Sequence, residues 1–191
     1  MAVGRTTTCF ALAATAVLCS VALAQADLVG SKMPPLVFER WVDAAGCDAP
    51  DPAVRATLYR WWTDGCPHCE KTLPAVEALR KKYEAKGLRV VAVYHPKPVR
   101  GVSDADVRAA AKRMGYGGAI ALDQDWSELK KFYLDTGDRP ATSASFLVDA
   151  GGVIRLVHPG PRFFPSDDPA RAKEGADYRR IEAAIGQVVR D

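Results

Sequence analysis

The sequence predicts one three-layer α/β domain with a mixed central sheet, extending from about residue 27 to residue 191. Runs of β-branched and aromatic residues alternate with segments of helical periodicity, which indicates a parallel-centred sheet with helices on its faces. The last two runs flank a short turn instead of a helix, so they add antiparallel pairing at one edge. With 48% hydrophobic and 26% charged residues, the chain has the composition of an ordinary globular domain.

The first elements of the predicted domain lie between residues 27 and 87. Residues 27–53 form a proline-rich, extended lead-in, within which residues 35–42 can add a strand. The β-branched and aromatic run at 55–63 predicts a buried strand. Apolar residues then recur at helical spacing over 67–86, and Gly87 supplies the C-terminal stop.

The rest of the domain continues the alternation. Ser103, with Asp106 three residues later, is typical of a helix start, and Gly115 marks its end. The turn at 149–152 predicts a hairpin between the last two strands. In order, the expected elements are a strand at 88–95, a helix at 103–115, a strand at 119–122, a helix at 125–137, two strands within 143–160 and a helix at 168–190.

Residues 1–26 are predicted to be a secretory signal peptide and not part of the fold. Arg5 supplies a short basic region, residues 10–24 are small and apolar, and small-x-small cleavage sites end at Ala24 and Ala26. We therefore expect a periplasmic or otherwise exported protein. An uncleaved membrane anchor is the disfavoured alternative, because the apolar run is short for a bilayer.

Export determines which of the five cysteines remain in the mature protein. Cys9 and Cys19 leave with the signal peptide, so three remain in a compartment that permits disulfides. Cys66 and Cys69 stand two residues apart, and Cys47 lies in a loop of Gly, Asp and Pro. An odd number leaves at least one thiol free or paired with another molecule, and Cys47 is expected to be that spare thiol, with intermolecular pairing as the alternative.

The Cys66-Pro67-His68-Cys69 tetrad stands where a strand ends and a helix begins. Pro67 suits the first helical position, where its missing N–H is no loss. Free backbone N–H groups and the helix dipole favour a thiolate at Cys66, so we expect its pKa to lie below the free value of about 8.5. The imidazole of His68, in the same turn, acts in the same direction. A reactive thiol with a second thiol one turn away suits disulfide exchange.

A pair of cysteines at this spacing can also bind a metal or form a structural disulfide. A structural zinc site needs a second close pair of ligands, which Cys47, His95 and His158 do not form. A structural disulfide across two residues closes almost no loop and stabilises little. A Cu(I)-binding metallochaperone remains the alternative, because soft thiolates suit Cu(I), with His95 or His68 as further ligands. A redox-active dithiol is the preferred interpretation, and no metal or organic cofactor is expected.

The segment "WWTDGCPHCEKTLPAVEAL" resembles the active-site strand and helix of thioredoxin-like proteins, in particular the exported redoxin/TlpA-like branch. The resemblance extends over most of residues 30–160, including an extra α/β unit at roughly 103–123 and the closing hairpin "SFLVDAGGVIRLVHPG". It implies that Cys66 is the nucleophile and Cys69 the resolving thiol. It also implies that Trp62 is the aromatic residue before the active-site loop and that Pro74 kinks the helix. The tetrad itself resembles that of periplasmic disulfide-introducing thioredoxins, whose helical insertion this chain lacks.

Three positions depart from the family pattern. Ser143 stands where relatives have a cis-proline facing the dithiol, and its hydroxyl is expected to donate to the Cys66 sulfur or to a substrate backbone. Arg60 replaces a buried Asp; it either favours thiolate at the dithiol or points outward to solvent. Thr72 replaces a Glu, so both family carboxylates are missing. Asp64 and Glu70 are charges near the dithiol, expected to be solvated.

Four further positions, at His95, His158, Phe163–Phe164 and Trp61, have predicted roles in the core, in a turn or near the dithiol. His95 is either a loop histidine or a proton relay or ligand near Cys66, since it follows the second core strand. His158 is expected to have a turn role. Phe163 and Phe164 form either an exposed docking patch or a buried contact under the last helix. Trp61 is expected in the core.

These observations predict an exported thiol–disulfide oxidoreductase that exchanges disulfides with protein partners through Cys66 and Cys69. The expected partners are exported proteins with cysteines or disulfides and a membrane-bound redox protein. The net charge of +3 with interspersed signs gives no reason to expect nucleic acid, and a monomer is expected. The Pro-His pair favours an oxidant, whereas the family resemblance favours a reductant. A thiol peroxidase is a third possibility, since Thr63 has the spacing to Cys66 that the resemblance implies for peroxidatic sites.

Overall fold

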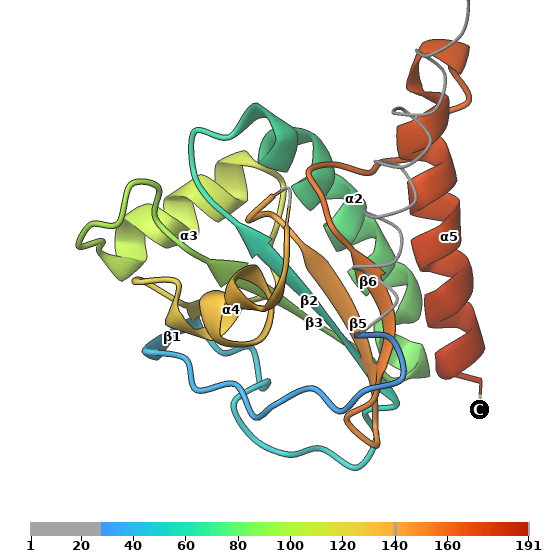
Figure 1. Cartoon of the computed structure of the whole chain (residues 1–191), viewed down its shortest axis with the longest axis horizontal. Helices are drawn as coiled ribbons and strands as arrows, with labels where there is room; N and C mark the ends of the chain where they lie inside the picture. The colour runs from blue at the N-terminus through green and yellow to red at the C-terminus, as the bar shows by residue number, and fades with distance from the viewer. Residues whose placement is uncertain (1–27, 140, 191) are drawn as a thin grey trace, which may run out of the picture.

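The centre of the fold is a six-stranded mixed sheet (Figure 1). The computed structural model describes residues 28–139 and 141–190, so the predicted signal peptide lies outside the described residues. The strands run in the spatial order β1-β4-β3-β2-β5-β6, with β2, β3 and β4 parallel and the other pairings antiparallel. Their bounds are β1 Arg40–Asp43, β2 Ala56–Trp62, β3 Leu88–Tyr94, β4 Ala119–Leu122, β5 Ser145–Asp149 and β6 Ile154–His158.

Helices cover both faces of this sheet. Side chains of α2, α3 and α5 share one core with the sheet, whereas α4 and the lead-in at 28–47 share the second core on the opposite face. Figure 1 shows α2 and α5 side by side. The α-helices are α2 Pro67–Tyr83, α3 Asp104–Arg113, α4 Ser127–Phe132 and α5 Ala172–Val188; short 3-10 turns are η1 Glu84–Lys86, η2 Leu134–Thr136 and η3 Pro169–Arg171. The predicted three-layer α/β/α architecture is therefore confirmed.

Local sequence signals explain where α2 and α3 begin and end. Cys66 is the N-cap of α2 and Pro67 its first residue, as predicted. Gly87 has φ of +92°, and a Cβ there would lie 2.7 Å from the carbonyl oxygen of Ala53, so glycine is required. The Ser103 hydroxyl accepts a hydrogen bond from the backbone N–H of Asp106 at 3.1 Å, which is the predicted cap of α3.

Three predicted elements have different bounds. The strand expected at 35–42 pairs only over β1, because Pro34 and Pro35 lack the N–H groups that a ladder needs. The helix expected at 125–137 is α-helical only over α4, since Trp126 before it has φ of +67°. The last helix opens with the 3-10 turn η3 before α5 begins. Among the described residues, no helix has the length and apolarity needed to cross a membrane.

Candidate active site

The dithiol lies at the carboxyl end of β2, where the chain turns into α2. Cys66 is half-buried and Cys69 is fully buried, with no exposed surface, and both are free thiols. Asp64 and Gly65 form the turn between strand and helix, and the positive φ of Gly65 lets the chain reverse there. A partner molecule can therefore reach the sulfur of Cys66 and cannot reach that of Cys69.

Arg60 lies beneath this pair with no exposed surface. Its Nη1 donates to the carbonyl oxygen of Ser143 at 2.6 Å and to the Ser145 hydroxyl at 3.2 Å, and its Nη2 donates to the carbonyl oxygen of Pro161 at 2.6 Å. The guanidinium also lies over the Phe163 ring, 5.6 Å from its centroid. The alternative that Arg60 points outward to solvent is wrong, because residues at even positions of β2 face α2.

Ser143 connects the arginine to the buried sulfur. Its hydroxyl lies 3.4 Å from the Sγ of Cys69, while its carbonyl accepts from Arg60. We expected the hydroxyl to contact Cys66, and the structure corrects this: the contact is with the second cysteine. The segment before β5 brings Ser143 to the inner side of the pair, so its hydroxyl stabilises charge on Cys69.

The surroundings of the reduced pair favour ionisation of Cys69 over ionisation of Cys66. A hydrogen bond between the two sulfur atoms is the largest effect on both groups: it raises the pKa of Cys66 and lowers the pKa of Cys69 to about 5. Burial opposes ionisation of Cys69, but the positive charge of Arg60 and the Ser143 hydroxyl favour it. The expected lowering at Cys66 is therefore wrong. The backbone N–H groups of α2 do act on Cys66 as expected, but the neighbouring sulfur outweighs them.

Of the predicted residues around the dithiol, His68 lines the cavity beside Cys66, whereas Trp62 and Trp61 lie in the core. His68 is half-buried and lines the cavity beside Cys66, yet its Nδ1 has no hydrogen-bond partner and no hydrogen bond joins its ring to the sulfur. Trp62 is fully buried against Tyr94, with ring centroids 4.9 Å apart. It supports the end of β2 from within the core and does not line the cavity. Trp61 is also in the core, as expected.

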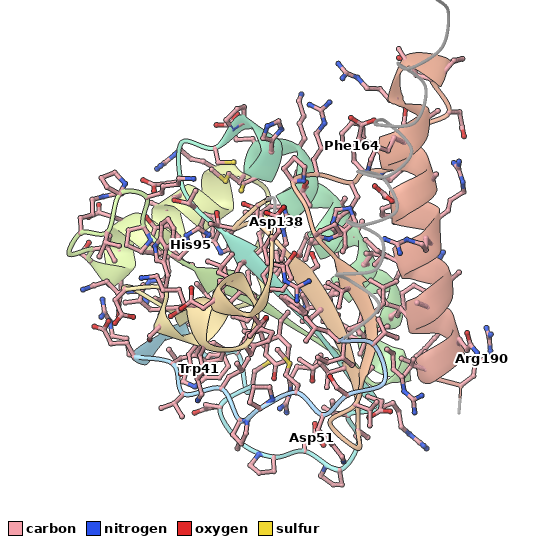
Figure 2. The ribbon with its side chains drawn as sticks, viewed as in Figure 1. Trp41, Asp51, His95, Asp138, Phe164 and Arg190 are labelled. Carbon is pink, nitrogen blue, oxygen red and sulfur yellow. The ribbon has the colours of Figure 1, made fainter. Side chains whose placement is uncertain are left out.

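His95 is fully buried at the end of β3, on the face that α4 covers (Figure 2). Its ring meets Trp126 edge to face, with centroids 4.9 Å apart, and neither ring nitrogen has a hydrogen-bond partner. Burial lowers its pKa to about 3, so the ring is neutral. No hydrogen bond of the described residues joins His95 to either cysteine, which disfavours the relay role considered from the sequence.

Asp64 and Thr72 have partners that the sequence did not reveal. Asp64 accepts from the Tyr94 hydroxyl at 2.7 Å and from Arg100 at 2.8 Å, so the expectation of a solvated carboxylate is wrong. Hydrogen bonds from Tyr94 and Arg100 hold the pKa of Asp64 below its ordinary value against the effect of burial. Thr72 is buried and accepts from the backbone N–H of Phe163 at 3.3 Å. Glu70 is exposed, as predicted.

Phe163 is fully buried, so it is not part of a docking patch, and Phe164 is half-buried against the same core (Figure 2). The Phe163 ring packs edge to face on His158, with centroids 5.0 Å apart. His158 has the expected turn role, because its Nδ1 accepts from the backbone N–H of Gly160 at 3.2 Å. Its Nε2 faces Asp177 at 3.3 Å, a contact with α5 that sequence reasoning missed.

A cavity of about 480 Å³ opens beside Cys66. Sequence reasoning did not predict that Lys97, Thr142 and Pro161 line this cavity, because they come from separate loops. Only their closeness in sequence to Ser143 and to the end of the hairpin could have indicated some of these residues. The cavity is lined by Thr63, Asp64, Gly65, Cys66, His68, Lys97, Ala141, Thr142, Ser143, Gly160 and Pro161.

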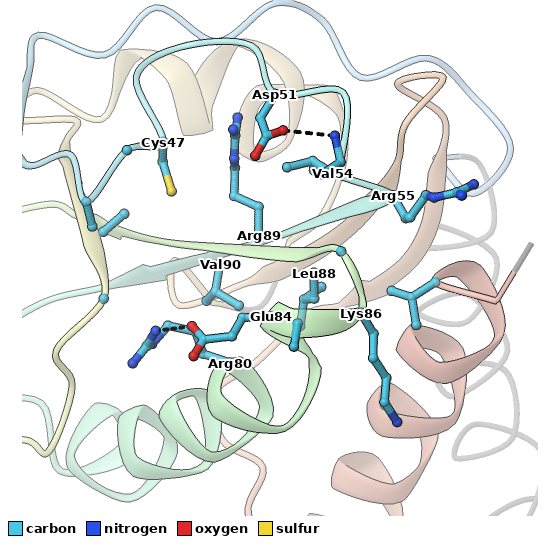
Figure 3. A pocket seen from close by; sticks show the side chains of 18 of the residues that line it. Cys47, Asp51, Val54, Arg55, Arg80, Glu84, Lys86, Leu88, Arg89 and Val90 are labelled. Carbon is cyan, nitrogen blue, oxygen red and sulfur yellow. Dashed lines mark hydrogen bonds and ion pairs between the residues drawn. The ribbon is translucent and has the colours of Figure 1, made fainter.

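A second cavity, of about 610 Å³, lies at the opposite end of the sheet (Figure 3). Cys47 lines it, and burial raises the pKa of this thiol. The cationic side chains around it do not converge: Arg89 extends toward the Cys47 side, Arg80 pairs with Glu84, and Arg55 points away. Cys47 is thus remote from the dithiol, which agrees with a spare thiol.

No three His, Cys, Asp or Glu side chains within residues 28–139 and 141–190 gather closely enough to hold a metal ion. A copper site at the dithiol would therefore rest on two sulfur atoms, without His95 or His68. The hydroxyl of Thr63, which the peroxidase alternative requires near Cys66, donates instead to Asp64 at 3.4 Å.

Comparisons with known proteins agree with this geometry. The model of the AhpC/TSA family matches residues 52–157, just over half of the chain. The thiol-disulfide oxidoreductase ResA of Halalkalibacterium halodurans is 26% identical over 106 residues, which cover 56% of this chain and 54% of that protein. The match thus spans about half the length of this curated relative.

Solved structures share the fold. A putative protein disulfide isomerase from Bacteroides thetaiotaomicron has a TM-score of 0.61 at 15% identity, covering 85% of this chain and 91% of its own. A thiol-disulfide isomerase from Corynebacterium glutamicum has a TM-score of 0.57 at 16% identity, and the match covers 83% of this chain and 96% of that chain. A putative thiol:disulfide interchange protein DsbE from Chlorobium tepidum has a TM-score of 0.56 at 20% identity, and the match covers 82% of this chain and 97% of that chain. At these identities the likeness shows the fold, and the predicted thioredoxin-like architecture is confirmed.

Proposed function

The chain belongs to the AhpC/TSA family, and on this premise we propose that it is an exported thiol–disulfide oxidoreductase that acts through Cys66 and Cys69. The observation that carries the proposal is the unequal exposure of two free thiols at the N-terminus of one helix. One sulfur is open to a partner, and the other is sealed beneath it. This is the arrangement that exchange through a mixed disulfide needs.

In the proposed reaction, Cys66 forms the bond with the partner. When the pair is oxidised, a partner thiolate attacks the Cys66 sulfur and Cys69 leaves as a thiolate. When the pair is reduced, Cys66 attacks a partner disulfide and Cys69 later displaces the partner from the mixed disulfide. The cavity of about 480 Å³ beside Cys66 gives room for the partner's sulfur and adjoining backbone.

The proposed partners are exported proteins with cysteines or disulfides, together with a membrane-bound redox protein that resets the pair. Two features support this. The segment before the domain is predicted to direct export. The curated relative, of which about half is matched, is named a thiol-disulfide oxidoreductase. No cofactor is required, because each exchange step passes electrons from one sulfur pair to another.

A trapping experiment tests the proposal. The Cys69→Ser variant is made with Cys47→Ser in the predicted mature protein, residues 27–191, so that Cys66 is the one remaining thiol. It is incubated with a disulfide-bonded protein such as insulin. We expect a covalent adduct on Cys66 that dithiothreitol releases, because the resolving thiol is absent.

The control is the Cys66→Ser, Cys47→Ser protein, which keeps the buried thiol and should form no adduct. Equal adduct formation by the two proteins would contradict the proposal. Stoichiometric Cu(I) binding without any disulfide exchange would favour the metallochaperone, and turnover of peroxide at Cys66 faster than exchange would favour a peroxidase.

A further inference from the structure

Arg60 carries a buried charge that no anionic side chain balances. Its side chain has no exposed surface, and none of the ion pairs among the described residues includes it. Two carbonyl oxygens, one hydroxyl and the face of Phe163 contact it, and all of them are neutral. Burial lowers the pKa of Arg60, and a hydrogen bond with the Cys69 side chain opposes this effect. The buried Nε of Arg60 has no hydrogen-bond partner. Burying an unpaired charge is costly, so the surroundings should supply a counter-charge.

The titratable groups around Arg60 come from four elements. From β6, His158 receives a hydrogen bond at Nδ1 from Gly160, so its proton is on Nε2 and the ring is neutral. From α5, Asp177 is committed to His158 and to Lys173, at 3.3 and 2.6 Å. At the end of β3, His95 is neutral, since burial lowers its pKa. From α2 come the two thiols, which can become anionic in the reduced protein.

Of these two thiols, Cys69 is the one that shares a direct partner with Arg60. Both contact Ser143, Arg60 through the carbonyl oxygen at 2.6 Å and Cys69 through the hydroxyl at 3.4 Å. The guanidinium and the buried sulfur thus lie on two sides of one residue. Lys97, which lines the cavity together with Cys66, is exposed, whereas Arg60 is buried and is not among the residues that line the cavity.

We propose that Arg60 is the fixed counter-charge of the Cys69 thiolate and that this pairing makes the protein an oxidant, which introduces disulfides into the dithiols of exported proteins. The inference rests on the proposed function and gives it a direction. Arg60 is a positioning residue here, because it acts on the leaving sulfur and does not touch the partner.

The reaction balances without a cofactor. A partner thiolate attacks Cys66, a new S–S bond forms, the Cys66–Cys69 bond breaks, and Cys69 leaves as a thiolate beside Arg60. A second partner thiolate attacks the partner sulfur of the mixed disulfide and expels Cys66, which takes up a proton. The partner loses two electrons and gains a disulfide, and this protein gains the two electrons. A disulfide of higher potential restores the oxidised pair.

Stabilisation of the reduced state explains why the protein oxidises its partners. A thiol of lower pKa leaves faster, and a stabilised thiolate favours the reduced pair. The neighbouring Cys69 sulfur raises the pKa of the exposed Cys66. A thiol of raised pKa presents less thiolate to a partner disulfide, which disfavours attack by the reduced protein on partner disulfides.

Two substitutions of Arg60 separate charge from packing. Arg60→Gln keeps donors for the carbonyl oxygens but removes the charge, whereas Arg60→Lys keeps the charge. The dithiol–disulfide equilibrium with glutathione is measured for both, together with thiolate ultraviolet absorbance against pH. We expect Arg60→Gln to shift the equilibrium toward the disulfide by about tenfold or more, which corresponds to about 30 mV, and to raise the midpoint of thiolate formation. Arg60→Lys should stay within about threefold of the wild type.

An Arg60→Gln protein with the wild-type equilibrium and thiolate midpoint would overturn the inference, and the proposed function would stand if the Cys66 adduct still forms. If Arg60→Gln does not fold, the wild-type titration decides: thiolate absorbance must rise well below the ordinary thiol range, and a rise only at or above it overturns the inference. Absence of exchange by the wild type would instead contradict the proposed function.

Discussion

The two sulfur atoms of the dithiol have separate environments although they are three residues apart. Cys66 meets the cavity and the backbone N–H groups of α2, while Cys69 meets Ser143 and the charge of Arg60. This difference gives each thiol one task in the proposed exchange. The exposed sulfur bonds to the partner, and the buried sulfur leaves and returns as a thiolate.

Stability of the reduced protein should therefore depend on pH through Cys69. Its pKa is lowered to about 5 in the folded state, so its contribution is present above the ordinary thiol value of about 8.5 and is lost as pH falls toward 5. Between these values, the free energy of unfolding should rise by up to about 1.4 kcal/mol per pH unit relative to Cys69→Ser. The raised pKa of Cys66 reverses the sign above the ordinary value, because that contribution is lost as pH rises further.

Urea unfolding in the presence of a phosphine reductant measures this slope. The oxidised protein is the matched control, since the sulfur atoms of Cys66 and Cys69 do not titrate in a disulfide while Cys47 is the same in both proteins. Parallel pH profiles for the oxidised and reduced proteins would show that Cys69 holds no thiolate in the fold.

At the scale of elements, the hairpin end and the segment before β5 hold the site from the side opposite α2. Gly160 has φ of +87°, and a Cβ there would lie 2.5 Å from the carbonyl oxygen of Ser143, the oxygen that accepts from Arg60. The turn after β6 therefore sets the position of Ser143 and, through it, the surroundings of Cys69.

A pair of glycine substitutions tests this role of the turn. Gly160→Ala should lose about 1–2 kcal/mol from the left-handed conformation and about 1–3 kcal/mol more from the clash, and it should slow exchange severalfold. Gly152→Ala is the control, because Gly152 has φ of +77° but a Cβ there would have only the Cδ of Lys32 within 4.0 Å. Gly152→Ala should lose only the stability that comes from the left-handed conformation, and it should exchange disulfides at the wild-type rate. Thermal unfolding measures the stability of both variants, and oxidation of a dithiol peptide by the oxidised protein measures exchange. Equal effects of the two substitutions on exchange would contradict a role for the turn.

The elements and the position of the dithiol could be predicted, because strand and helix periodicity, Pro67 and the capping residues are local signals. The orientation of Arg60 could not be predicted, because burial alternates over the first part of β2 but is continuous over Arg60, Trp61 and Trp62, so no outward side is marked there. Asp64 was misjudged for a different reason: its partner Arg100 lies 36 residues away in another loop. The charge on Cys69 depends on Ser143, a contact across 74 residues.

At the scale of the whole molecule, the dithiol and the cavity beside Cys47 occupy opposite ends of the sheet. Exchange at Cys66 therefore leaves the third thiol uninvolved, which is why Cys47→Ser serves as a background for trapping. Export of the whole chain remains a prediction from the N-terminal sequence.

Secretion of the full-length chain from a bacterial host tests that prediction. The periplasmic protein should begin at Gln25 or Asp27, because the small-x-small sites end at Ala24 and Ala26. N-terminal sequencing identifies the residue, and a variant with Ala24→Arg and Ala26→Arg should accumulate uncleaved. A periplasmic protein that retains Met1 would contradict cleavage and favour the anchor.

The central claim is that Cys66 and Cys69 form one reversible redox couple with its charge on the buried sulfur. A titration of the wild-type protein with reduced and oxidised glutathione, read by peptide mapping, tests it most directly. We predict that these two cysteines, and not Cys47, form a disulfide in a single reversible two-electron step. The equilibrium of this step with glutathione should favour the reduced dithiol over the disulfide. Absence of this disulfide at every glutathione ratio, or a bond between either cysteine and Cys47 in its place, would contradict the claim.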